Sequence, residues 1–80
     1  MPKSVMFMYQ GYQFQCSAER EGPARYRPIL LRRLPWPSEE LKPLLSDGDT
    51  CRTEAQALRQ AEAQAMRWVD ARMAHQLLST

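Results

Sequence analysis

The last third of the chain constrains the fold most, because it predicts one long helix. No glycine or proline follows Gly48, and seven of the nine alanines lie at or after Ala55, a composition that strongly favours helix. Thr53 followed three residues later by Gln56 is a capping-box pattern. We therefore expect a helix over about residues 54–78, roughly 37 Å long at 1.5 Å per residue.

Apolar residues recur along this segment at helical spacing, so one stripe is expected to pack on the rest of the chain. The stripe comprises Leu58, Ala61, Ala65, Val69 and Met73. A compact chain of this length is only about 30 Å across, so residues 74–78 should overhang the packed part or fray. Leu77 and Leu78 are then a candidate dimer contact or partner site, with a frayed chain end as the alternative.

The first part of the chain alternates between apolar and polar residues, which is typical of a half-buried strand. The alternation is clean from Tyr12 to Glu19, with Phe14, Cys16 and Ala18 on the apolar side, and it extends upstream as far as Val5. It predicts a strand over about residues 4–19, with a bulge or bend at Gly11.

A turn at Gly22-Pro23 connects this segment to a second apolar run. Because the connection is short, the run over about residues 25–34 is predicted to form an antiparallel strand. Pro28 has no N–H group, so the N–H side of that position must face an edge or an irregularity. Alternation divides the strand into an apolar face with Tyr26, Leu30 and Leu34 and an opposite face with Arg25, Arg27 and Arg33.

Residues 35–50 are predicted to form an irregular loop, because Pro35-Trp36-Pro37 interrupts the second strand. Leu44-Leu45 and residues 49–52 are candidates for a short third strand around an Asp47-Gly48 turn. The predicted fold is α+β: a single domain over residues 1–80, in which a two- or three-stranded antiparallel sheet packs against one long C-terminal helix.

Composition limits the classes of protein to which the chain can belong. Hydrophobic residues make up 44% and charged residues 25%, as in ordinary soluble domains. No apolar run is long enough for a membrane span or a signal peptide, so we expect a cytoplasmic protein. Thiols stay reduced in that compartment, so Cys16 and Cys51 are expected to be free.

The sequence offers no motif for catalysis, a metal or a cofactor. Two cysteines and one histidine lack the spacing of zinc ligands. His75 lies near the end of the predicted helix, where a cation stabilises the negative end of the helix dipole. We therefore expect no catalytic residue, cofactor, metal or small-molecule substrate.

Arginines give the first half of the chain its charge. Residues 1–34 contain six basic and two acidic side chains. Arginine binds phosphates through paired hydrogen bonds, and glutamine amides contact base edges. A candidate nucleic-acid surface comprises Gln13, Gln15, Arg25, Arg27, Arg32 and Arg33, and an ordinary solvent-exposed arginine face is the alternative.

Trp36 is the other unusual residue, because it lies between two prolines in the predicted loop. Folding back to enlarge a thin core is the favoured interpretation, and anchoring a partner protein is the alternative. Together these observations favour a non-enzymatic protein-interaction or regulatory module that binds a protein partner or a second copy. A nucleic-acid-contacting module is the second hypothesis.

Short motifs are spread over about residues 9–70. They are Tyr9-Gln10-Gly11-Tyr12, Arg25-Tyr26-Arg27-Pro28, Gly48-Asp49-Thr50, Thr53-Glu54-Ala55 and Trp68-Val69-Asp70. In this combination the chain resembles small bacterial proteins of the HicB-like and HlyU-like groups. The resemblance implies a strand–strand–(strand)–helix layout, and it does not imply a function.

Overall fold

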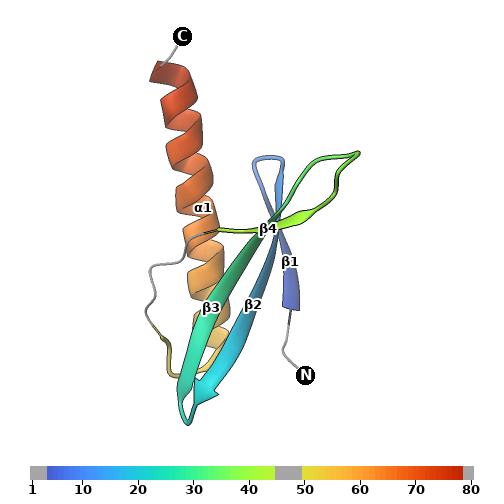
Figure 1. Cartoon of the computed structure of the whole chain (residues 1–80). Helices are drawn as coiled ribbons and strands as arrows, with labels where there is room; N and C mark the ends of the chain where they lie inside the picture. Colours follow the sequence, from blue (N-terminus) through green and yellow to red (C-terminus); the bar gives the residue numbers. More distant parts are fainter. Residues whose placement is uncertain (1–3, 45–49, 79–80) are drawn as a thin grey trace.

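The computed structural model describes residues 4–44 and 50–78. An antiparallel sheet with the strand order β1-β2-β3-β4 carries one helix, α1, on one face (Figure 1). Within the described residues, no helix has the length and apolar character needed to cross a membrane. The elements are β1 (Ser4–Tyr9), β2 (Tyr12–Gly22), β3 (Arg25–Arg33), β4 (Leu41–Pro43) and α1 (Glu54–Leu78).

The segment predicted as one strand over residues 4–19 is two strands. Gln10 and Gly11 have φ values of 52° and 83°, the backbone of a two-residue type I′ hairpin turn. Tyr9 therefore pairs with Tyr12, and β1 folds back along β2. The prediction of a bulge or bend at Gly11 was wrong because alternation continues unchanged on both sides of a two-residue turn.

The β2–β3 hairpin agrees with the sequence analysis. The strands pair from Gln13↔Arg33 to Gly22↔Arg25, with a bulge between Arg20 and Gly22. Gly22 ends β2, and the turn that follows places Ala24 at a φ of 52°. The predicted strand over residues 25–34 is confirmed as β3.

Part of the segment predicted as irregular, residues 35–50, is ordered as a strand. Leu41–Pro43 forms β4 and pairs with β3 over Leu31–Arg33. The predicted third strand at Leu44-Leu45 and residues 49–52 is not formed over its described part. Only Cys51 forms an isolated bridge there, to Tyr26, whereas the Asp47-Gly48 turn lies outside the described residues.

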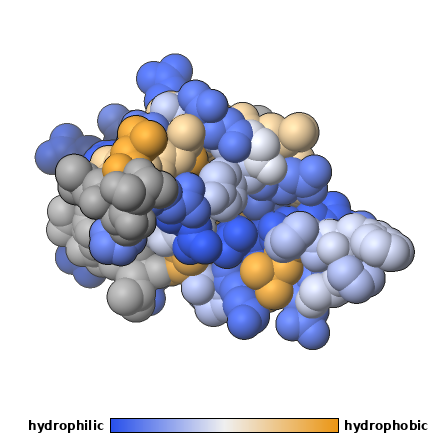
Figure 2. Space-filling model, turned by 90° about the horizontal axis from the view of Figure 1, so that it is seen from above, coloured by the Kyte–Doolittle hydropathy of each residue, from blue (hydrophilic) through white to orange (hydrophobic). Residues whose placement is uncertain are grey.

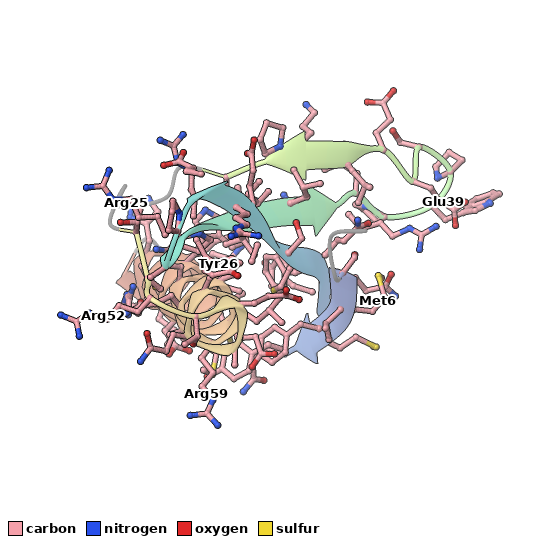
Figure 3. The ribbon with its side chains drawn as sticks, turned by 90° about the horizontal axis from the view of Figure 1, so that it is seen from below. Met6, Arg25, Tyr26, Glu39, Arg52 and Arg59 are labelled. Carbon is pink, nitrogen blue, oxygen red and sulfur yellow. The ribbon has the colours of Figure 1, made fainter. Side chains whose placement is uncertain are left out.

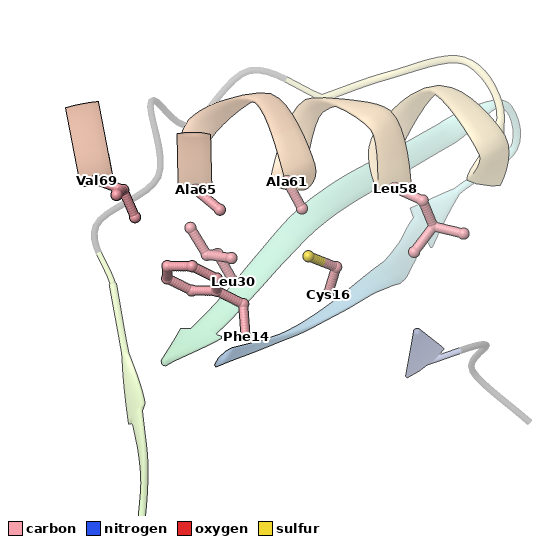
Figure 4. Packing of buried hydrophobic residues seen from close by; sticks show 7 residues of the cluster. All are labelled: Phe14, Cys16, Leu30, Leu58, Ala61, Ala65 and Val69. Atoms are coloured by element: carbon pink, nitrogen blue, oxygen red, sulfur yellow. The ribbon is translucent and has the colours of Figure 1, made fainter. Parts of the chain in front are cut away.

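The core lies between α1 and the β2–β3 pair (Figure 4). Phe14, Cys16 and Leu30 project from the sheet and are buried against the helix. Small side chains at Ala61 and Ala65 let the helix axis approach the strands closely, so a thin core is still well packed. The predicted helical stripe is confirmed, except that Met73 is 39% exposed.

The helix begins and ends as the sequence suggests. The Thr53 hydroxyl accepts a hydrogen bond from the Gln56 main-chain N–H at 3.1 Å, and the Gln56 side-chain Oε1 accepts one from the Arg52 N–H at 3.2 Å. Val69 is the last buried residue, and residues 70–77 are exposed. The predicted overhang is therefore confirmed, and the chain remains helical to Leu78.

Candidate functional site

The helix covers one face of the sheet and leaves the other uncovered. Because side chains alternate, residues beside those of the core project from the opposite face. The strand register places Met6, Gln15, Leu31 and Pro43 in one row across this face. The next row toward the loops contains Met8, Gln13, Arg33 and Leu41.

Exposed apolar side chains are numerous on the uncovered face, and its charged residues lie toward the two ends of β3. Met8 is 66% exposed, Met6 is 52% exposed and Leu41 is 43% exposed, whereas Ile29 and Leu31 are half-buried. Figure 3 shows Met6 projecting from β1 on the side away from α1. Protein interfaces combine an uncharged centre rich in methionine with an arginine-containing rim. The uncovered face has this distribution, with Arg33 at one end and Arg27 at the other.

The candidate nucleic-acid residues do not form one continuous surface. Gln13, Gln15, Arg25, Arg27 and Arg33 share the uncovered face, but Arg27 and Arg33 are six residues apart on β3, about 20 Å. Ile29 and Leu31 separate them. The Nε of Arg27 also forms an ion pair with Glu21 Oε1 at 2.8 Å. The basic groups are therefore split into two ends.

Arg32 lies on the other face of the sheet, so its assignment to the same candidate surface was wrong. Its guanidinium carbon is 5.2 Å from the centre of the Tyr12 ring and 5.1 Å from that of Trp68. The buried Nε has no hydrogen-bond partner among the described residues. Cation–π contacts hold this side chain beside the core. Alternation predicts this position, since Arg32 is two residues after the buried Leu30.

The candidate protein-contact residues lie in different places. Trp36 is 82% exposed, so the favoured prediction that it folds into the core was wrong. It lines an open cleft with Gly11, Gln13 and Arg33 at the loop end of the sheet. This position next to the uncovered face supports the alternative, in which Trp36 anchors a partner.

The end of the helix presents less apolar surface. Leu77 is 77% exposed, and the side chain of Leu78 lies outside the described residues. Figure 2, viewed down on this end of the molecule, shows hydrophobic residues as separate spots on a mostly hydrophilic surface. The uncovered sheet face is therefore the larger candidate surface.

The strand β1 also forms an edge of the sheet, which the sequence analysis missed. Its residues Ser4–Tyr9 contain no charge, no proline and no glycine. Treating residues 4–19 as one strand concealed this edge, because Met6 and Met8 then had no assigned neighbour. Two exposed methionines alternating with aromatic residues before a Gly were the available signal.

A second group of arginines was also missed. Arg52 and Arg59 line an open groove beside the first half of α1, together with Cys51 and Gln60. Figure 3 shows Arg52 and Arg59 extending into solvent beside α1, away from Met6. Arg52 lies before the first residue of α1, so helical spacing does not relate it to Arg59, and no local pattern predicted this group.

The side chains with reactive chemistry, Cys16, Cys51 and His75, lie in separate parts of the fold. Cys16 and Cys51 are free thiols, as predicted. Burial, with a smaller contribution from the negative charge of Glu62, raises the pKa of Cys16 to about 11. His75 lies exposed in the last turn of α1. Within residues 4–44 and 50–78, no cluster of three His, Cys, Asp or Glu side chains could hold a metal.

Comparisons with protein-family models, with curated proteins and with solved structures give no match to this chain. The resemblance to HicB-like and HlyU-like proteins stays a prediction.

Proposed function

We propose that the chain is a non-enzymatic protein-interaction module that binds a partner protein through the uncovered face of its sheet. The observation that carries the proposal is the exposure of Met6, Met8 and Leu41 on this face. The row that contains Met6 has no charged residue, and the row that contains Met8 and Leu41 has one, Arg33. Burial of this surface would contribute about 25 cal/mol per Å² of apolar area. Trp36 supplies a large anchor at its margin, and tryptophan is enriched among the residues that dominate binding energy.

A nucleic acid fits this face less well than a protein does. Each phosphate contact needs its own cation. The middle of the face has the apolar residues Ile29 and Leu31 where such cations would be needed. One of the arginines, Arg27, is already neutralised by Glu21. Binding of nucleic acid is one of the outcomes that the experiment below distinguishes.

Site-specific photo-cross-linking in cells tests the proposal. A photoreactive amino acid replaces Met8 on the uncovered face, and a matched variant carries it at Arg59 on the helix side. The proposal predicts a protein adduct of defined mass at Met8 that is absent at Arg59. Adding Leu31→Ser, which removes an apolar side chain from the same face, should abolish the adduct.

Two outcomes would contradict the proposal. Equal adducts from Met8 and Arg59 would show that the face has no preference for a protein. Nuclease-sensitive adducts at Met8, together with duplex binding that weakens with salt and on Arg33→Ala, would favour nucleic-acid contact.

A further inference from the structure

The direction of the backbone groups of β1 follows from its turn. In a two-residue hairpin the residues that flank the turn, here Tyr9 and Tyr12, exchange hydrogen bonds. Every second residue back along β1, Phe7 and Val5, then also bonds to β2. The N–H and C=O groups of Ser4, Met6 and Met8 therefore point away from the sheet.

The opposite edge of the described sheet, β4, offers fewer outward groups. The N–H of Leu34 donates to the Glu40 carbonyl at 2.8 Å, and that of Leu44 donates to the Leu30 carbonyl at 3.0 Å. These bonds place the outward side of β4 at Leu41 and Pro43, and proline has no N–H to offer. Further along β3, Tyr26 exchanges two bonds with Cys51.

We propose that β1 pairs antiparallel with β1 of a second copy of this chain, about a two-fold axis that relates Met6 to Met6 of the second copy. This register places Ser4 opposite Met8 and joins every outward group of both strands in about six main-chain hydrogen bonds. An isologous contact of this kind closes, so it gives a dimer. The proposal goes beyond the proposed function, because the edge and the uncovered face are different surfaces.

A second copy fits the edge for two reasons. β1 has no charged residue, so two copies meet without repulsion, and its lack of proline leaves all the outward donors available. The helix packs mainly on β2 and β3, which leaves Val5 and Phe7 only half-buried. In the dimer Val5 of one copy lies beside Phe7 of the other, a β-branched and aromatic pair that stabilises antiparallel strands.

The two-fold axis is perpendicular to the sheet, so both helices lie on one face of an eight-stranded sheet. The uncovered faces of the two copies then join, with the Met6 and Met8 side chains at the centre. The proposed dimer therefore doubles the surface that the proposed function assigns to a partner protein.

Charge exchange at Met6 tests the pairing and its register by sedimentation equilibrium. Met6→Lys places two positive charges opposite each other, and Met6→Glu places two negative charges there, so each variant alone should raise the dimer dissociation constant by about tenfold or more. An equimolar mixture should form a heterodimer. Leu31→Ser, on the uncovered face away from the edge, is the control and should leave the dissociation constant unchanged.

Three results would overturn the inference. They are a wild-type chain that stays monomeric at millimolar concentration, a mixture of the two charged variants that stays monomeric, and a dimer lost on Leu31→Ser, which would show face-to-face packing. Circular dichroism of each variant verifies the fold.

The failure of the dimer and the failure of the proposed function are distinguishable. A dimer without a Met8 adduct to another protein would contradict the proposed function alone. A monomer with such an adduct would contradict the dimer alone.

Discussion

The two edges of this sheet differ in length and in the residues that carry their outward backbone groups. β4 is three residues long, contains Lys42, and has Pro43 at the position where an N–H would point outward. β1 is six residues long and uncharged, and its outward N–H groups are all present. Short length, lysine and proline are common means of preventing strand addition. The difference indicates that, within the described residues, the β1 edge is the better suited of the two to pairing.

The hydrogen bonds on the β4 side of β3 explain why a proline is tolerated at position 28. Its neighbours on the same side of β3, Tyr26 and Leu30, bond to Cys51 and Leu44, so Pro28 occupies the interval between the two covering segments. The missing N–H of Pro28 therefore leaves no donor unsatisfied on that side. The sequence-based expectation that its N–H side faces an edge or an irregularity is confirmed.

The largest expected effect comes from proline at alternate positions of β1. Phe7→Pro removes an N–H that bonds to β2, and it should lower the free energy of unfolding by about 1–3 kcal/mol more than Phe7→Ala does. Met6→Pro removes an outward N–H, so it should differ from Met6→Ala by less than about 1 kcal/mol. Urea unfolding at low protein concentration measures all four variants. Equal proline penalties at the two positions would contradict the assigned directions.

A smaller effect should follow from opening the β4 edge. Pro43→Val supplies an outward N–H and a residue that favours strands. We expect this variant to form species larger than a dimer, because both edges of each copy can then pair. Sedimentation velocity over a range of concentrations measures this. Pro35→Val, in the loop before β4, is the matched control and should leave the oligomeric state unchanged.

The two cysteines differ in accessibility, because Cys16 lies at the centre of the sheet and Cys51 lies in the segment that pairs with Tyr26 of β3. Cys16 is buried with its pKa raised to about 11, whereas Cys51 is half-buried. A thiol reagent at pH 8 should label Cys51 quickly and Cys16 only on unfolding, since the thiolate is the reactive form. Mass spectrometry of the labelled peptides measures both rates. Equal rates would show that the strands open together.

The raised pKa of Cys16 also gives the chain a pH dependence. Between the ordinary thiol pKa of 9.0 and about 11, the unfolded thiol loses its proton while the folded one keeps it. The stability of the wild type should therefore fall as pH rises through this window, relative to Cys16→Ala. If the free energy of unfolding depended on pH in the same way in both proteins, the raised pKa of Cys16 would be contradicted.

The smallest effect concerns the contact between α1 and β1. The Tyr9 hydroxyl donates a hydrogen bond to Asp70 Oδ1 at 2.9 Å, and this bond, with burial and the negative charge of Asp70, raises the pKa of Tyr9. Asp70→Asn should lower the pKa of Tyr9 toward its ordinary value with little change in stability. Titration of the Tyr9 ring protons by NMR measures the shift. An unchanged pKa would show that the contact is absent in solution.

Local patterns predicted the helix and the β2–β3 hairpin well. Thr53 and Gln56 mark the start of α1, and alternation from Tyr12 to Ala18 identifies the core face of β2. These features depend on residues close together in the chain. The hairpin at Gln10-Gly11 was missed because Gln-Gly lacks the Asn or Asp that commonly marks a type I′ turn.

The candidate site was predicted less completely because it depends on contacts between distant residues. The sequence indicates that Gln13 and Arg33 are polar, but only the strand register places them together with Met8 and Leu41. The exposure of Trp36 depends on a loop whose path no local pattern specifies. The open edge at β1 could not be predicted while residues 4–19 were treated as one strand, because the edge exists only where β1 and β2 are separate strands.

Amide hydrogen exchange of β1 tests the central claim most directly. At a concentration where the dimer is populated, the N–H groups of Met6 and Met8 should exchange slowly, and dilution to the monomer should make them exchange rapidly, whereas Phe7 stays protected at both concentrations. Rapid exchange at Met6 and Met8 in a populated dimer would contradict the account, because the two copies would then be joined through another surface.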